Sequence, residues 1–335
     1  MPELRRDPIS FTWVIFAPDR KSRPQYFEYP GTENFSAAHC PFCEGNEAMT
    51  PPEIFALRPK GGNANERDWR LRVVPNKFPA LKVEGSLSRR AEGPYDWLSG
   101  IGAHEVVIET PGHRVEIEDM DVESIRQIFL TYKVRLLDLK KDIRLKYIQI
   151  FKNHGPRAGA TIPHAHSQVI ALPIIPPPVE ARLKTAGEHF DRKERCLICD
   201  VLFHERENRQ RLLTENTDFI VTAPYASRFP FELRLFPIEH GARFEEVPDT
   251  VFTPLAETLK DTVIRLNRVL DHPDYHWLLV NSPFHQDCRE WFHWYLEIVP
   301  LVSGTGGFEL GTGTYINPIP PEEAVEILKD EKHNK

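Results

Sequence analysis

The feature that most constrains this chain is a cysteine–histidine pattern that occurs twice in the same order. Each copy begins with two cysteines separated by two residues and continues with two histidines much further along the chain. The first copy consists of Cys40, Cys43, His113 and His164, and the second of Cys196, Cys199, His240 and His293. A nearly equal stretch separates the histidines in both copies. The repeat predicts that the two halves of the chain fold alike.

Strand and helix patterns repeat in step with the cysteines and histidines. Alternating apolar or β-branched residues predict strands, and apolar residues at helical spacing predict helices. The predicted strands are 105–109, 147–151, 232–236 and 277–280, and the predicted helices are 121–141 and 249–270. Asp121 and Asp249 are candidate N-caps or first-turn acids. We therefore expect an α+β fold of two units, 1–178 and 179–335, connected through Pro176–Pro178 and the charged stretch 180–195.

Each copy of the pattern offers a set of metal ligands. Structural zinc prefers four sulfur and nitrogen ligands, and a CxxC turn often supplies two of them. A histidine taken alone is more often a surface or hydrogen-bonded core residue, but two sets in matching order favour metal. We expect Zn²⁺ at the first set and a second ion at the other. His104 is a rival ligand for the first set; it ranks behind His113 because the second half has no counterpart.

The segment from Gly155 to Gln168 carries the residues best suited to chemistry. Glycines and small residues let backbone N–H groups approach an anion closely. Alternation predicts a strand that presents His164, His166 and Gln168 on one face. A neutral imidazole attacks phosphorus readily, which makes His166 the candidate nucleophile, and Gln168 could donate to non-bridging oxygens. The alternative is that both histidines bind metal and Gln168 is a polar strand residue.

The motif at 164–168, His-Ala-His-Ser-Gln, resembles the HxHxQ motif of the galactose-1-phosphate uridylyltransferase branch of the histidine-triad superfamily. The resemblance covers nearly the whole chain, from the arginines of the opening segment through the first CxxC, the run 76–81 and the run 110–113. It implies a zinc held by the first set, nucleotidylation of His166, and a homodimer. Each chain would be two fused histidine-triad-like units in a half-barrel of antiparallel strands with flanking helices.

The resemblance also implies which residues contact substrate. Asn153, Gly159, Thr161 and Gln168 would contact phosphates, Asn76 and Phe78 the base and ribose, and Arg20 and Arg23 the nucleotide. The segment 304–318, which includes the expected substrate contact Phe308, departs from the uridylyltransferase pattern. It is similar to the tail of the plant-type ADP-glucose phosphorylases, as is Ser167 in place of glycine.

The reaction implied is a double displacement. His166 attacks the α-phosphorus of a nucleotide sugar, UDP-glucose or ADP-glucose, and a sugar 1-phosphate or phosphate acceptor then takes the nucleotidyl group. In the second half, Tyr295 and Glu297 replace His166 and Gln168, which predicts one active site per chain. A hexose-1-phosphate uridylyltransferase is the first interpretation and an ADP-glucose phosphorylase the second. A histidine-triad-type hydrolase and a zinc-stabilised nucleotide-binding protein without turnover are alternatives.

Composition excludes other classes of partner. The net charge of −7 gives no reason to expect nucleic acid. No apolar run approaches the ~20 residues that span a bilayer, and the first residues lack the apolar stretch of a signal peptide. We therefore expect a cytoplasmic protein with no membrane partner.

Overall fold

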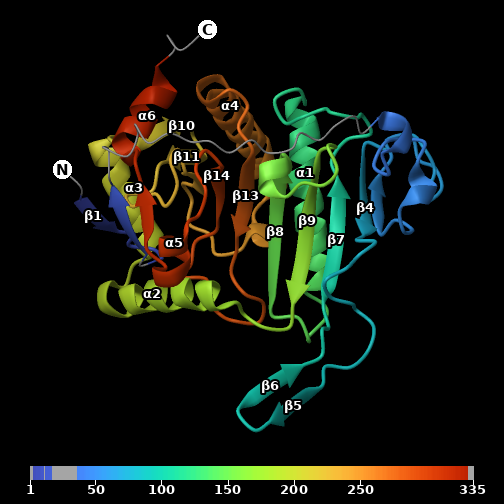
Figure 1. Cartoon of the computed structure of the whole chain (residues 1–335), viewed down its shortest axis with the longest axis horizontal. Helices are drawn as coiled ribbons and strands as arrows, with labels where there is room; N and C mark the ends of the chain where they lie inside the picture. Colours follow the sequence, from blue (N-terminus) through green and yellow to red (C-terminus); the bar gives the residue numbers. More distant parts are fainter. Residues whose placement is uncertain (1–2, 11, 17–35, 331–335) are drawn as a thin grey trace.

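The computed structural model describes residues 3–10, 12–16 and 36–330. Within these residues, ten strands form one open antiparallel sheet (Figure 1). Their order across the sheet is β10 (Leu212–Glu215), β11 (Phe219–Thr222), β12 (Leu233–Pro237), β14 (Tyr295–Pro300), β13 (Tyr275–Val280), β8 (Tyr147–His154), β9 (His166–Leu172), β7 (Ala103–Ile108), β4 (Leu71–Pro75) and β3 (Phe55–Leu57). The α+β prediction is confirmed, and the sheet does not close.

The strand order shows the repeat as a pseudo-twofold arrangement. Counting from the edges inward, β3, β4, β7, β9 and β8 match β10, β11, β12, β14 and β13. The two innermost strands, β8 and β13, pair antiparallel, with Phe151 opposite Leu278 and Asn153 opposite His276. The four predicted strands correspond to β7, β8, β12 and β13. One sheet therefore runs through both halves without a break.

Helices α1 (Val122–Leu139) and α4 (Phe252–Leu270) cover one face of this sheet and pack against each other. The apolar positions predicted from helical spacing are all buried: Ile125, Ile128, Phe129, Tyr132 and Leu136 in α1, and Phe252, Leu255, Leu259, Val263 and Leu266 in α4. Burial of each large apolar side chain contributes about 1.5–3 kcal/mol. Asp121 caps α1 by accepting from the Ser124 N–H, whereas Asp249 lies in the 3-10 turn Asp249–Val251 before α4.

The remaining elements lie around the large sheet. A second sheet of the described residues joins β1 (Glu3–Arg6), β2 (Trp13–Phe16) and β15 (Tyr315–Asn317) over the second-half strands (Figure 1). The hairpin of β5 (Arg89–Glu92) and β6 (Tyr95–Leu98) projects from the body. The other helices in the described ranges are α2 (Pro177–Lys193), α3 (Leu197–Asn208), α5 (Gly307–Thr312) and α6 (Pro321–Lys329), with 3-10 turns at Ala37–His39, Glu47–Met49, Pro156–Ala158 and Phe244–Glu246.

The stretch 180–195, expected to connect the two units, is mostly the helix α2; its buried positions Val179, Leu183 and Ala186 give it an apolar stripe between the charges. One local expectation was wrong. The strand predicted across 164–168 begins only at His166, because the His164 side chain turns toward Cys40, Cys43 and His113 before the strand starts. No helix in the described part of the chain is long and apolar enough to cross a membrane.

Candidate functional site

Two groups of cysteine and histidine side chains come together among the described residues, in the two sets that the sequence pattern predicts. In each group one ligand atom per residue lies within 4.8 Å of all the others. In the first group, Cys40 and Cys43 lie on the turn after the 3-10 segment Ala37–His39, and His164 precedes β9. His113 follows β7. The first group therefore ties an N-terminal turn to the ends of two neighbouring strands.

The distances in the first group match a tetrahedral metal site. His164 Nδ1 lies 3.6 Å from both cysteine sulfurs, and His113 Nδ1 lies 3.4 Å from Cys43 Sγ. Tetrahedral zinc bonds of 2.3 Å to sulfur and about 2.0 Å to nitrogen place these atoms about 3.5 Å apart. His164 Nε2 lies 2.8 Å from the Thr110 carbonyl, so Nε2–H donates there and Nδ1 keeps its lone pair for a metal. Burial lowers the pKa of His164 to about 4, which keeps the ring neutral.

The second group repeats this arrangement. Cys199 Sγ lies 3.3 Å from His240 Nδ1 and 3.6 Å from His293 Nδ1. The Nε2 atoms of His240 and His293 again face backbone carbonyls, at 2.7 and 3.0 Å. Hydrogen bonding between the two cysteines lowers the pKa of Cys196 and raises the pKa of Cys199, so Cys196 is the thiol of this pair that deprotonates first. Both groups could therefore hold a metal ion.

His166 is the first residue of β9 and lies on the face of the sheet opposite the helices. The next residue, Ser167, points the other way and is fully buried, with its Oγ 2.7 Å from the Tyr132 hydroxyl of α1. Strand alternation then places His166 and Gln168 on the open face. His166 Nδ1 lies 2.7 Å from the His164 carbonyl. Since that oxygen can only accept, Nδ1 carries the proton and Nε2 presents a lone pair. Burial lowers the pKa of His166, so the ring is neutral near pH 7.

The loop 155–160 connects β8 to the histidine motif. Gly155 has φ +83° and Gly159 has φ +82°, a backbone region that favours glycine. A Cβ at Gly155 would collide with the Asp274 carboxylate, which also accepts from the Arg157 N–H. Asp274 thus fixes the position of the loop next to the end of β8. A side chain at Gly159 would face the Asn153 amide.

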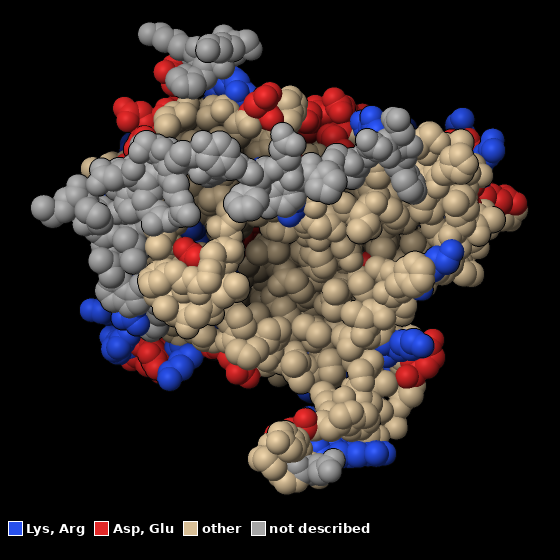
Figure 2. All heavy atoms as spheres, in the orientation of Figure 1, with Lys and Arg blue, Asp and Glu red and all other residues tan. Residues whose placement is uncertain are grey.

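Asn153 and the loop border a hollow of the open face. His276 Nδ1 lies 2.9 Å from Asn153 Oδ1 across the β8–β13 junction. Asn153, Gly155 and His166 line a cavity of about 80 Å³. A separate cavity of about 490 Å³ is lined by residues that include Arg157 of the same loop, His276 and Leu278. Figure 2 shows this face hollowed near its centre, with most Lys, Arg, Asp and Glu side chains around the rim. The hollow leaves room for a ligand that reaches the strands from the open side.

Gln168 belongs to a polar network with residues of the 76–80 segment. Its Oε1 lies 2.8 Å from His104 Nε2. Asn76 Nδ2 lies 3.0 Å from the same ring nitrogen, and Asn76 Oδ1 accepts from the Phe78 N–H. The structure thereby joins two residues expected at the base and ribose to the amide expected at the phosphate. His104 lies in this network and not in the first metal group.

The other expected substrate contacts are less closely gathered. Thr161 is exposed at the end of the loop. The Phe78 side chain is 84% exposed, open to a ligand and packed against little else. Phe308 lies on α5, over the second half of the sheet and away from β7 and β9 (Figure 1). Arg20 and Arg23 lie outside the described residues.

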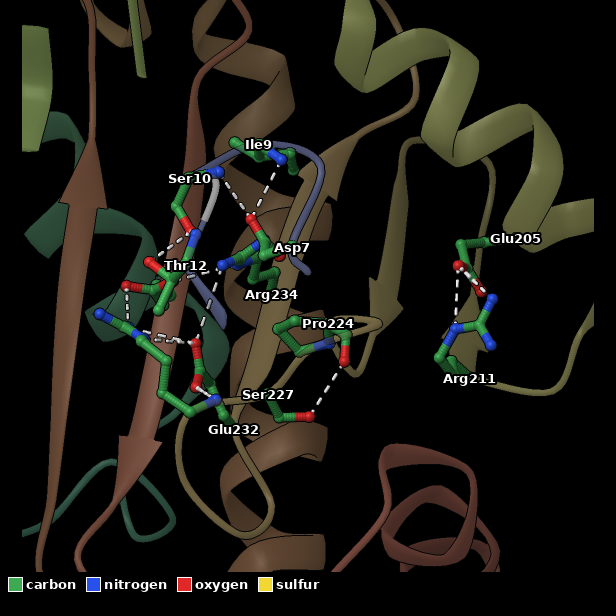
Figure 3. A network of polar contacts seen from close by, with 12 residues as sticks. Asp7, Ile9, Ser10, Thr12, Glu205, Arg211, Pro224, Ser227, Glu232 and Arg234 are labelled. Carbon is green, nitrogen blue, oxygen red and sulfur yellow. Dashed lines mark hydrogen bonds and ion pairs between the residues drawn. The ribbon is translucent and has the colours of Figure 1, made fainter. Parts of the chain in front are cut away.

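The second half has the matching positions but closes them with ion pairs. Tyr295 begins β14 as His166 begins β9, and Glu297 follows as Gln168 does; both are buried. Arg234 lies 3.0 Å from Glu297 and 3.0 Å from Asp7, and Figure 3 shows it between Asp7 and Glu232. Burial alone would raise the pKa of Glu297, but Arg228 and Arg234 outweigh it and lower the pKa. At the position that Gln168 holds in the first half, the second half therefore has a carboxylate that pairs with Arg228 and Arg234.

Phe42 and Asp274 are among the residues near the nucleophile and its loop that escaped the sequence analysis. Phe42, between the paired cysteines, packs against His166 with ring centroids 5.2 Å apart and against His164 at 6.0 Å. Its place inside the CxxC turn was a usable signal. Asp274, the anchor of the loop, comes from the other half of the chain, and no local pattern connects it with residues 155–157.

Comparisons with known proteins agree with this geometry. Residues 1–176 match the family model described as galactose-1-phosphate uridyl transferase, N-terminal domain. The chain is 36% identical to ADP-glucose phosphorylase from Arabidopsis thaliana, over 98% of this chain and 93% of the relative. It is 28% identical to galactose-1-phosphate uridylyltransferase from Thermotoga maritima, over 98% of each. The crystal structure of an Arabidopsis ADP-glucose phosphorylase with bound ADP-glucose superposes with a TM-score of 0.84 at 34% identity, covering 98% of this chain and 99% of the other.

Proposed function

The chain belongs to the galactose-1-phosphate uridylyltransferase family of nucleotidyltransferases, and we propose that it transfers a nucleotidyl group from a nucleotide sugar to a phosphate acceptor through His166. The observation that carries the proposal is the His166 ring itself. Its Nδ1–H is held by the His164 carbonyl at 2.7 Å, so Nε2 is the free, neutral nitrogen. A nucleophile prepared in this way needs no base to remove a proton.

The proposed reaction has two displacements. In the first, the Nε2 lone pair of His166 forms a bond to the α-phosphorus, the bond from phosphorus to the bridging oxygen breaks, and sugar 1-phosphate leaves with the electron pair. In the second, an oxygen of the acceptor phosphate attacks the same phosphorus and the bond to Nε2 breaks. The ring keeps its Nδ1 proton throughout, and the His164 carbonyl stabilises the positive charge that develops on it.

Donors on the open face would stabilise the phosphate during each displacement. Gln168 lies two residues along the same strand face from His166, and the Asn153 amide lies at the end of β8 beside Gly159 of the loop. Donors placed before the reaction stabilise charge as it shifts onto non-bridging oxygens. Asn76 and Phe78, at the other end of the network, would contact the nucleoside.

Sequence identity favours adenine over uracil in the donor. The relative named ADP-glucose phosphorylase is 36% identical, whereas the Thermotoga uridylyltransferase is 28% identical over a similar span. The related structure with bound ADP-glucose covers nearly the whole chain. We propose ADP-glucose as the first donor and phosphate as its acceptor. UDP-glucose with a hexose 1-phosphate acceptor, such as galactose 1-phosphate, is the second candidate.

We propose zinc at both cysteine–histidine groups, in a structural role. The donor sets of two thiolates and two imidazoles fit zinc in type and in spacing. At the first group, Cys40, Cys43, His113 and His164 would hold the ion, which would supply a crosslink. That crosslink would keep His164 in place, and with it the carbonyl that orients His166.

The division into units 1–178 and 179–335, the homodimer and the cytoplasmic location are also proposals. The matching strand orders support the two units. All five cysteines are free of disulfides, which suits a reducing compartment. Sedimentation at several concentrations would test the homodimer.

The test of the function is the intact mass of the protein after brief mixing with ADP-glucose, and separately with UDP-glucose, without acceptor. We expect an increase of one AMP with ADP-glucose and its loss in His166→Gly, a variant that keeps the wild-type circular dichroism spectrum. An increase of one UMP would keep the mechanism and support the uridylyltransferase. Turnover by water without any acceptor would identify a hydrolase, and no adduct with either donor would overturn the proposal.

A further inference from the structure

His104 occupies a position from which it can act on Gln168 without reaching the reacting atoms. It lies on β7 directly opposite Ile170 of β9. Along one face of β9 the order is therefore His166, Gln168, Ile170, with His104 beside the last of these. Gln168 stands between His104 and the nucleophile. Both side chains are half-buried on the open face of the sheet.

The hydrogen-bond partners of His104 determine where its proton lies. Ala80 donates its backbone N–H to Nδ1 at 3.1 Å, and a backbone N–H can only donate. A proton on Nδ1 would set two N–H groups against each other. Nε2 therefore carries the proton of the ring, and the atom it faces in Gln168 must be an acceptor. This assignment of the His104 proton does not depend on which way the Gln168 amide is oriented, because the backbone N–H of Ala80 can only donate.

The tautomer of His104 in turn orients the Gln168 amide. Nε2–H donates to Gln168 Oε1 at 2.8 Å, which leaves the Gln168 –NH₂ on the side away from His104, where His166 stands. The neighbouring Asn76 amide nitrogen, 3.0 Å from Nε2, is itself a donor and so cannot accept the Nε2 proton, and the Asn76 oxygen accepts from the Phe78 N–H instead. With Nε2 protonated, the Asn76 –NH₂ makes no hydrogen bond to the ring, and Gln168 Oε1 is the acceptor. Without His104, the carbonyl and the –NH₂ of Gln168 could exchange places by a half-turn of the side-chain amide.

We propose that His104 is a positioning residue, which holds the Gln168 amide with its –NH₂ toward the phosphate at His166. The proposal rests on the nucleotidyl transfer proposed above. A flipped amide would present an oxygen to an anionic phosphate, where the correct orientation presents two N–H donors. Loss of a single well-placed donor of this kind typically slows a reaction about 10²-fold or more. An amide that flips freely still presents its –NH₂ to the phosphate part of the time, so we expect removal of His104 to lower the rate only about tenfold.

The experiment is a double-mutant cycle on the single-turnover rate of His166 nucleotidylation. Its members are His104→Met, Gln168→Met and the double variant. Methionine keeps approximate side-chain length in each case and removes the polar groups. We expect His104→Met to slow nucleotidylation about tenfold, and Gln168→Met to slow it more. The double variant should be no slower than Gln168→Met, because His104 has nothing left to orient.

A second substitution at His104 separates the contribution of its Nε2–H group from that of the side-chain shape. His104→Gln places an amide N–H near the position of Nε2 and should recover most of the rate lost in His104→Met. Substrate KM should change little in both, because the ground-state contacts of the nucleoside remain. Equal metal content and equal thermal midpoints for the two variants would exclude a folding effect.

Additive losses in the cycle, or equal rates for His104→Gln and His104→Met, would overturn the role of His104 while leaving the transferase intact. A wild-type protein that forms no nucleotidyl adduct would instead overturn the proposed function, and the positioning role with it. The two failures are thus distinguished by the wild-type measurement alone.

Discussion

Tyr295 is the residue that the second half carries at the position of the nucleophile. Its hydroxyl is buried and has no hydrogen-bond partner within the described residues. We predict that Tyr295→Phe leaves nucleotidylation of His166 unchanged within about twofold and leaves stability unchanged or slightly higher, since it removes an unsatisfied buried polar group. Single-turnover kinetics and thermal unfolding would measure both. A loss of activity beyond tenfold would show that the second half takes part in the chemistry.

At the scale of single residues, the sequence predicted the members of each cysteine–histidine group because their order repeats. It also singled out His166 and Gln168, because motif and resemblance lie in one short segment. The partner of Gln168 could not be predicted: His104 is 64 residues away in sequence, and only the register of β7 against β9 brings the two side chains together. The sequence analysis kept His104 as a rival metal ligand behind His113, since the sequence does not show which way a histidine side chain points.

At the scale of elements, helix α1 offers a clear test of local stability. Asp121 accepts from the Ser124 N–H at 2.7 Å. We predict that Asp121→Ala destabilises the protein by about 1 kcal/mol, the usual cost of a lost N-cap. Urea denaturation would measure the shift. Glu123→Ala, in the same turn with its side chain 52% exposed, is the matched control and should change stability by less than about 0.5 kcal/mol.

The same cap has a predictable pH dependence. The hydrogen bond from Ser124 lowers the pKa of Asp121 below its usual 3.8. The folded pKa lies below the unfolded one, so the stabilisation is complete above the usual value and disappears as the pH falls through the folded value. The difference between wild type and Asp121→Ala should therefore narrow in acid. A constant difference down to pH 2 would contradict a charged cap.

Element types were predictable where periodicity was strong, as in α1 and α4. They were not where charge obscured an apolar stripe, as in α2, or where a buried ligand cluster displaced the start of a strand, as before β9. In both cases tertiary contacts decided the outcome. No local pattern predicts which neighbour a strand takes, and the junction of β8 with β13 became visible only in three dimensions.

At the scale of the whole molecule, the two cysteine–histidine groups make a matched pair for mutation. We predict two zinc ions per chain in the wild type and one each in Cys40→Ser and Cys196→Ser, measured by elemental analysis. Cys40→Ser should also lose most nucleotidyl transfer, because His164 and its carbonyl are no longer held in place. Cys196→Ser should keep most of it, with a lower thermal midpoint. Unchanged zinc in either variant would remove that group as a metal site, and equal activity losses would make the second group more than structural.

The pairing of β8 with β13 has a consequence for how such a chain can be divided. Each half, taken alone, would expose its innermost strand as a long bare edge, with unpaired N–H and C=O groups along five or more residues. Such an edge recruits any strand of matching length, and the best match available to either half is a second copy of itself. A separated half would therefore pair with itself or aggregate. Because both halves belong to one chain, β8 and β13 always have each other as pairing partners, and neither innermost edge is left open to another molecule.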